Sequence, residues 1–311
     1  MEEIKSTIKE FYSGECKDFS KTVNNIRRAY ANLLTSGSDF SFLTKKSDLE
    51  SFRTLRGQMW GIFLSLGEFD CPDEKDLYRD VTTSKYNEII KNSQNEISRI
   101  KKGENRFCGI DIDEYSAWLT LFSGFIYKET KKVFHQETYT FGILFLRNFD
   151  TTVAYQAYVH LLTPLKNAFL LEPTKRVHSL SKITYEVISV ADKELSEHIK
   201  KNSDVCSPFV TSYAPLSSLF SQLTPIESVE LFWDFLLIFG IQFCVYLQAA
   251  WLIMRKDDMI RDAKSNVAAD HSFKQDAQTL ILKAVNLYQE VNKVKPEIQD
   301  QILETIYESQ S

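Results

Sequence analysis

Glycine and proline are scarce in this chain, whose 311 residues include 10 glycines and 7 prolines. Because these two residues punctuate turns, their scarcity favours long helices over many short strands. Cysteine is limited to five residues, none of them spaced as Cys-x-x-Cys. That pattern fits a reducing compartment and argues against a disulfide framework or a zinc site.

No large excess of charge is present either, since the formal net charge is −5. Charged residues make up 25% and hydrophobic residues 43%, as in an ordinary soluble globular protein. Nothing favours binding to nucleic acid or to an anionic membrane surface. The sequence has no HExxH, GxSxG, P-loop or GxGxxG signature. Its first residues, MEEIKSTIKEF, lack an apolar signal region, so we expect a cytoplasmic protein.

One uncharged run, FLLIFGIQFCVYLQAAWLIM at residues 235–254, is about long enough to span a membrane. Upstream of it, Thr224 as N-cap, Pro225 at N1 and Glu227 at N3 predict a helix that begins near Pro225. Gly240 is a natural stop, which leaves roughly 15 residues or about 22 Å, short of a bilayer core of about 30 Å. A second helix is expected from about residue 241 to residue 255. We therefore interpret the run as two buried helices around a glycine turn, with a membrane-anchored helical protein as the alternative hypothesis.

Apolar residues at spacings of three and four predict further helices, over residues 17–34, 86–101, from Asp113 to about 134, and around 280–291. Ser47 and Glu50 form a capping-box pattern that predicts a helix through residues 52–60. Asp150 can cap another helix, which Pro164 should kink or end. Residues 173–203 have the pattern of a charged surface helix. The predicted fold class is all-α.

Four short stretches, in this order, resemble the signature of TBC domains, the GTPase-activating domains for Rab-type small GTPases. They are LRGQMW with Arg56 and Trp60, IKKGENR ending at Arg106, TYTFG with Tyr139, Phe141 and Gly142, and VELFWDFLLIFG with Trp233, Asp234 and Gly240. The resemblance covers about residues 50–257. Within the family, the stretch VAYQAYVHLL at 153–162 and the length near 300 residues are most similar to the spindle-position checkpoint members of the budding-uninhibited-by-benzimidazole type.

This resemblance implies a TBC-like multi-helix bundle over residues 47–260, with helical extensions over residues 1–46 and 261–311. It also implies a partner, a small GTPase in its GTP-bound state, and leaves open whether a second checkpoint subunit is needed. The Mg²⁺ and the nucleotide belong to the GTPase, so no metal or organic cofactor is expected in the chain itself. A cytoplasmic location follows, with spindle-pole association as a further expectation from the checkpoint members.

An activating protein of this kind inserts an arginine beside the GTP, where it stabilises the charge of the transition state and raises the rate by roughly 10³ to 10⁵. By resemblance, Arg106 is this arginine finger. The TBC family adds a glutamine that positions the attacking water. The interval from Arg106 to the glutamine position is 141 − 106 = 35 residues, about what the family shows.

Three departures from the family pattern bear on this role. Gly103 replaces the family's aspartate, and Glu104 stands one residue further on. Phe141 occupies the glutamine position, and a phenyl ring cannot hydrogen-bond a water. The arginine motif can also be aligned on SQNEISR, which retains an acid at Glu96 and makes Arg99 the finger, at an interval of 141 − 99 = 42 residues.

Two functional hypotheses follow from these departures. The first is a GTPase activator with a degenerate glutamine finger, in which Tyr139, Phe141, Gly142, Gly103 and Glu104 contact the GTPase. The second is a noncatalytic TBC scaffold that binds a GTPase or a checkpoint partner, with Phe141 as an ordinary core residue. In both, Arg56, Trp60, Trp233, Asp234 and Gly240 are expected to be structural.

Overall fold

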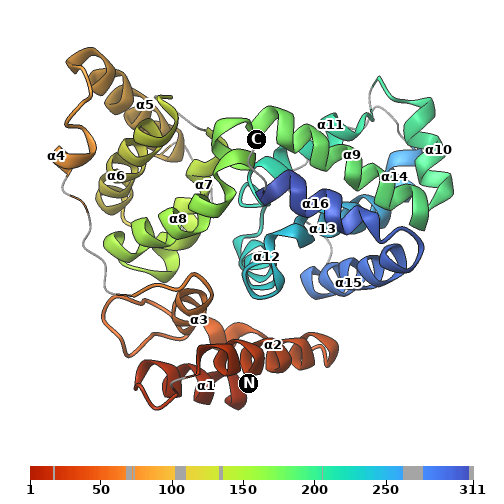
Figure 1. Ribbon diagram of the computed structural model, residues 1–311, viewed down its shortest axis with the longest axis horizontal. Helices are drawn as coiled ribbons and strands as arrows, with labels where there is room; N and C mark the ends of the chain where they lie inside the picture. The colour runs from red at the N-terminus through yellow and green to blue at the C-terminus, as the bar shows by residue number, and fades with distance from the viewer. Residues whose placement is uncertain are drawn as a thin grey trace. The chain divides into compact units, whose positions relative to one another are not determined.

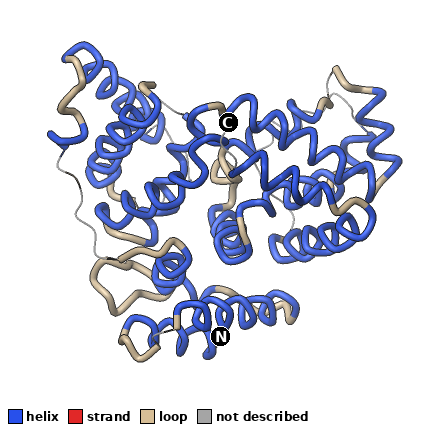
Figure 2. The backbone as a smooth tube through the Cα atoms, viewed as in Figure 1, coloured by secondary structure: helices blue, strands red, loops and turns tan. Residues whose placement is uncertain are grey.

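The structure is a computed structural model that describes residues 1–16, 18–67, 72, 74–101, 110–132, 136–204, 206–261 and 276–307. The chain divides into two compact units, Met1–Pro164 and Leu165–Ser311, and each is described by itself (Figure 1). Throughout the described part, helices are joined by loops, and the only β-pairing is two isolated bridges, Lys46 with Thr54 and Phe52 with Phe149 (Figure 2). The all-α fold class is therefore confirmed.

The first unit begins with two packed helices and continues through a 3₁₀ turn into a group of longer helices. Its elements are α1 Glu2–Tyr12, α2 Phe19–Thr35, η1 Ser41–Thr44, α3 Leu55–Phe63, α4 Glu74–Leu77, α5 Thr83–Lys101, α6 Ile112–Thr130, α7 Gln136–Asn148 and α8 Thr151–Lys166. Helix α1 packs on α2 and α3, α3 on α7, and α6 on α5 and α7. The helices predicted over residues 17–34 and 86–101 are confirmed as α2 and α5.

Aromatic rings fill the core of this unit where α6, α7 and α8 meet. The Trp118 and Phe122 rings of α6 stack with centroids 4.9 Å apart, and Phe122 lies edge-on to Tyr158 of α8 at 4.5 Å. All three side chains are fully buried. Each such ring removes 150–250 Å² from water, so a few of them supply much of the hydrophobic stabilisation of the unit.

Carboxylates and a hydroxyl cap several helices of the first unit. Asp18 accepts a hydrogen bond from the Lys21 amide at 3.0 Å at the start of α2. Asp150 accepts one from the Val153 amide at 2.8 Å at the start of α8, as predicted.

Pro164 lies inside α8. The regular α-helix ends two residues after it, and a π-helical turn, η3 Asn167–Leu171, follows. The predicted end of the helix at Pro164 is thus two residues early.

The helix start predicted from the capping box of Ser47 and Glu50 is wrong. The Ser47 hydroxyl accepts from the Leu49 amide at 2.9 Å in a local turn, and the Ser47 amide donates to the Arg53 carbonyl at 3.1 Å. Pairing between residues 45–47 and 53–55 therefore replaces a helix start there. Helix α3 begins only at Leu55, where the Thr54 hydroxyl accepts from the Gly57 amide at 3.0 Å.

The predicted cap at Asp113 is wrong by two residues. Asp111 is the N-cap of α6, and its carboxylate accepts from the amides of Asp113 and Glu114 at 2.8 and 3.0 Å. The helix ends at Thr130, before the predicted 134, because Lys131 adopts a left-handed conformation with φ of 58°.

The second unit is built around one central helix. Its elements are η3, α9 Pro173–Ala191, α10 Lys193–Lys201, α11 Pro208–Ser217, α12 Ile226–Phe239, η4 Ile241–Phe243, α13 Cys244–Met254, α14 Lys256–Arg261, α15 Ala277–Val294 and α16 Glu297–Tyr307. Helix α9 packs against α10, α11, α13, α15 and α16, and Figure 1 shows α16 alongside it.

The prediction of one charged surface helix over residues 173–203 is wrong on both counts. The chain breaks at Asp192, which ends α9 and caps α10 by accepting from the Leu195 amide at 3.0 Å. Helix α9 is the centre of the unit because one stripe of it, including Val177, Leu180 and Val187, is fully buried.

The run at residues 235–254 folds as two helices, as predicted. Helix α12 has 14 residues and ends at Gly240, whose φ of 119° suits glycine. Helix α13 follows after the turn η4 and is buried through Leu252. The expected start is one residue off: Pro225 is the N-cap, and no side chain caps α12. In the described part of the chain, no helix is long and apolar enough for a membrane span.

The last two helices agree with the pattern of the sequence. Helix α15 places Leu280, Ala284, Leu287 and Val291 on one buried face. Pro296 separates it from α16, which buries Ile298, Ile302 and Ile306 at helical spacing.

Candidate functional site

Three of the predicted site residues, Gly103, Glu104 and Arg106, lie outside the described residues. Helix α5 ends at Lys101, just before them, and the described chain resumes at residue 110. Arg99, the alternative finger, belongs to the last turn of α5. The finger role therefore stays a prediction for both arginines.

The LRGQMW stretch forms α3 and lies almost wholly inside the first unit. Arg56 and Trp60 are both buried, with Trp60 edge-on to Phe145 of α7 at a centroid distance of 6.3 Å. Gly57 rests on the backbone of Asn148, where a Cβ would overlap the carbonyl group. The Thr54 hydroxyl donates to the Asn148 side chain at 2.5 Å. This motif thus joins the start of α3 to the end of α7.

The TYTFG stretch forms the first turns of α7 and is equally buried. Phe141 is 0% exposed, and its ring centroid lies 6.3 Å from that of Tyr158. A Cβ at Gly142 would overlap the indole of Trp118, so only glycine lets α7 approach α6 this closely. As it stands, the side chain at the family's glutamine position points into the core.

Tyr139 connects this stretch to α5 through a buried polar group. Its hydroxyl lies 3.4 Å from the Ser123 hydroxyl of α6, which lies 3.5 Å from Ser93 of α5. Burial raises the pKa of Tyr139 well above its ordinary value, and the Glu96 carboxylate raises it further. The phenol is therefore neutral over the physiological range and available as a hydrogen-bond donor or acceptor.

The structure thus places Ser93 and Glu96 near Tyr139. Both residues belong to SQNEISR, the alternative alignment of the arginine motif, so this stretch lies near the TYTFG stretch. Arg56 and Trp60 lie at the other end of α7, near Asn148. Two residues that the sequence reasoning missed hold this end together: Asn148, and Glu114, which pairs with Arg53 and accepts from Thr151 at 3.1 Å. No local sequence pattern marks either residue, because their partners lie far away along the chain.

The VELFWDFLLIFG stretch belongs to the second unit, as α12. The Trp233 indole N–H donates to the Leu219 carbonyl at 2.8 Å, and Asp234 is fully buried. At Gly240 a Cβ would overlap the Gln242 side chain. In the structure, Trp233 and Asp234 are thus buried in α12, and Gly240 forms the turn at its end.

Comparison with known proteins bears directly on these stretches. The model of the Rab-GTPase-TBC domain matches residues 127–260, a little under half of the chain, and includes both the TYTFG and the VELFWDFLLIFG stretches. The predicted resemblance to the TBC family is therefore confirmed over residues 127–260.

One curated relative is a Dictyostelium discoideum protein, provisionally named as the mitotic check point protein BUB2. It is 22% identical over 240 residues, which is 76% of this chain and 63% of the relative. The chain thus matches less than two thirds of that protein's length. Among solved structures, the Chlamydomonas flagellar RabGAP TBC domain is 15% identical with a TM-score of 0.45, over 91% of this chain and 90% of that one.

Proposed function

We propose that this chain is a GTPase-activating protein, or the activating subunit of a complex, for a small GTPase of the Rab or Ras type. The match of residues 127–260 to the Rab-GTPase-TBC domain carries the proposal. The relative named as a mitotic check point protein extends it to mitotic exit and the spindle checkpoint. On this proposal residues 47–260 form the activating domain, flanked by extensions over 1–46 and 261–311.

The partner is the GTP-bound form of the GTPase, and Arg106 supplies the charge that its transition state lacks. Gly103 and Glu104 accompany Arg106 in the segment after α5 and contact the same partner. Tyr139, Phe141 and Gly142 form the second part of the site by family resemblance.

The position of Glu96 supports Arg99 as the competing finger. Glu96 acts electrostatically on Tyr139, and Arg99 follows Glu96 by three residues on the same helix. One turn of an α-helix holds 3.6 residues, so Arg99 belongs to the same turn of α5 as this acid. This arrangement keeps the acid that the Arg106 alignment loses at Gly103.

The burial of Phe141 supports a degenerate second finger. A phenyl ring in the core offers no group to a water, so the GTPase must orient the attacking water with a glutamine of its own. The same burial favours the second candidate, a noncatalytic scaffold that binds the GTPase or a checkpoint partner without accelerating hydrolysis.

Single-turnover GTP hydrolysis by candidate mitotic and Rab-type GTPases, with and without a candidate second subunit, separates these functions. An activator accelerates hydrolysis, and Arg106→Ala removes the effect while Arg99→Ala leaves it. The reverse result assigns the finger to Arg99. Arg79→Ala is the matched control, because Arg79 is an exposed arginine paired with Asp76 on the surface.

Acceleration that survives both arginine substitutions, or no acceleration by any candidate, would refute the activator proposal. Binding of the GTP-loaded GTPase without acceleration would establish the scaffold instead. Imaging of the tagged chain in mitotic cells tests the expected cytoplasmic and spindle-pole location.

A further inference from the structure

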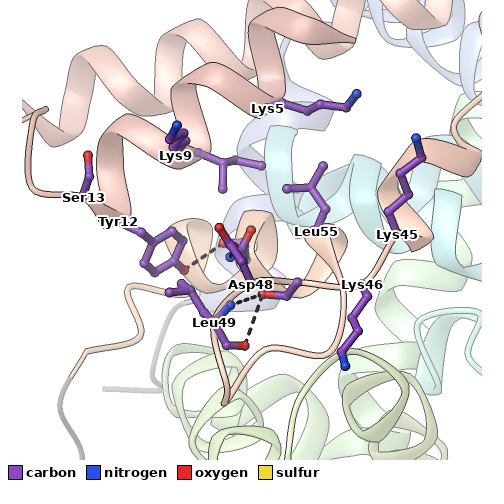
Figure 3. A pocket seen from close by; sticks show the side chains of 12 residues that line it. Lys5, Lys9, Tyr12, Ser13, Lys45, Lys46, Asp48, Leu49 and Leu55 are labelled. Carbon is purple, nitrogen blue, oxygen red and sulfur yellow. Dashed lines mark hydrogen bonds between the residues drawn. The ribbon is translucent and has the colours of Figure 1, made fainter.

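A groove in the first unit lies apart from all of the family's motif positions except α3. It has a volume of about 580 Å³ and is lined by α1, by residues 45–49 and by two residues of α3 (Figure 3). That volume lies within the usual range for ligand sites, about 300–1,000 Å³. No part of the proposed GTPase chemistry uses it.

The groove is strongly basic in a chain whose net charge is −5. Four lysines line it, Lys5, Lys9, Lys45 and Lys46, against one carboxylate, Asp48. Lys5 pairs with Glu2 at 2.7 Å. The other three lysines have no carboxylate within ion-pair distance among the described residues, and only Lys45 acts electrostatically on a nearby carboxylate, that of Glu2. The charges of Lys9 and Lys46 are therefore available to a ligand, and that of Lys45 is shared in part with Glu2.

The lysines do not converge on one point. Figure 3 shows Lys5 and Lys45 toward one end of the groove, with Lys9 and Lys46 well apart from each other and from them. A single phosphate group would need donors gathered around it. Spread cations instead match a ligand that carries several negative charges along its length.

Between the lysines, the floor of the groove is apolar. Ile8, Leu49, Leu55 and the ring of Tyr12 line it, and the Tyr12 hydroxyl is already used, donating to the Gln58 carbonyl at 2.9 Å. Asp48 is likewise engaged, since its carboxylate accepts from the Gln58 side-chain Nε2 at 3.1 Å. A ligand that fits this surface therefore needs apolar side chains as well as negative charge.

The backbone at Lys46 adds a third feature. The Ser47 amide donates to the Arg53 carbonyl at 3.1 Å, and the Leu55 amide donates to the Lys45 carbonyl at 3.0 Å. In this antiparallel pattern the N–H and C=O of Lys46 point away from residues 53–55. They have no partner among the described residues, so they form a short free edge to which an extended chain can pair.

We propose that this groove binds an extended acidic peptide segment of a partner protein, with carboxylates on the lysines and apolar side chains on the floor. The inference is independent of whether the chain accelerates GTP hydrolysis.

Fluorescence anisotropy of the full chain with a labelled decapeptide of alternating glutamate and leucine tests the proposal. The wild type should bind this peptide and not the decapeptide of alternating lysine and leucine. Lys45→Glu with Lys46→Glu should weaken binding by about tenfold or more, because two attractions become repulsions. Both side chains are exposed, so circular dichroism should show an unchanged fold.

The matched control is Lys200→Glu with Lys201→Glu, another adjacent pair of exposed lysines, in α10 of the second unit, which should change the affinity less than twofold. Lys9→Glu with Lys46→Glu, one change on each wall, is a second variant that should weaken binding to a similar extent. Equal losses at the groove and in α10, or no peptide binding by the wild type, would overturn the proposal.

Two further arms identify the ligand class. A peptide with N-methylated leucine amides should bind several-fold more weakly, and equal affinity would exclude pairing with the Lys46 edge. Phosphatidylserine vesicles that bind through Lys45 and Lys46 while the peptide does not would overturn the proposal in favour of a lipid surface.

Discussion

Replacing Phe141 by glutamine tests whether the family's second finger position faces a partner or the core. Phe141 is 0% exposed on α7, against Tyr158 of α8. A glutamine there loses the burial of the phenyl ring and leaves a partly filled cavity, together about 2–3 kcal/mol. Its amide also loses water without a designed partner, which costs about 1–3 kcal/mol. We therefore expect Phe141→Gln to lower the free energy of unfolding by about 3–6 kcal/mol.

This loss is a large share of the stability of about 5–15 kcal/mol that a typical protein has. Urea denaturation followed by circular dichroism measures it, since the transition midpoint should fall sharply. Phe141→Leu, which keeps an apolar side chain, should cost only about 1–2 kcal/mol. Phe19→Gln is the control for the same chemical change on a ring that is 45% exposed, and should change stability by about 0.5 kcal/mol or less.

A loss below about 1 kcal/mol for Phe141→Gln would refute the placement of Phe141 in the core, because replacing a buried phenyl ring by a polar side chain lowers stability by more than that. Hydrolysis by the folded variant gives the complementary result. If Phe141→Gln accelerates GTP hydrolysis beyond the wild type without losing stability, the side chain faces the GTPase and position 141 is the glutamine-finger register.

Three further predictions use the same urea assay. Gly142→Ala should lower the free energy of unfolding by about 1–3 kcal/mol, because the new Cβ would overlap the Trp118 indole of α6. Unchanged stability would mean that α6 and α7 can move apart without loss. Gly240→Ala should cost about 1–3 kcal/mol, since its φ of 119° suits only glycine and the Cβ meets Gln242. Asp111→Ala should cost about 1 kcal/mol by removing the cap of α6, whereas Asp113→Ala should cost much less. Equal losses at the two aspartates would contradict the assigned cap.

Helical periodicity and a few turn residues were sufficient to predict much of the fold. The α15 face and the break at Gly240 follow from the spacing of apolar residues and from the backbone freedom of glycine, which are local properties. The resemblance to the TBC family is likewise carried by short stretches, two of which, TYTFG and VELFWDFLLIFG, lie within the match over residues 127–260.

Burial could not be read in the same way, because it depends on which segments meet. Residues 173–203 have the pattern of a charged surface helix because charged residues recur along them, yet five other helices pack around α9. Ser47 with Glu50 looked like a helix start, but pairing between residues 45–47 and 53–55 satisfies the backbone there instead. In the first case contacts distant along the chain, and in the second a pairing between residues 47 and 53 and between 45 and 55, outweighed a local preference worth about 1 kcal/mol.

The sequence by itself determined the all-α class, the division of the 235–254 run and the family to which residues 127–260 are similar. Only the tertiary structure decided that Phe141 lies in the core, that Glu96 acts on Tyr139, and that three lysines without a described carboxylate in ion-pair distance surround one groove. The reason is physical: a helix is fixed by hydrogen bonds between residues four apart, whereas a core, an electrostatic contact and a groove are made by side chains whose separation along the chain carries no local pattern.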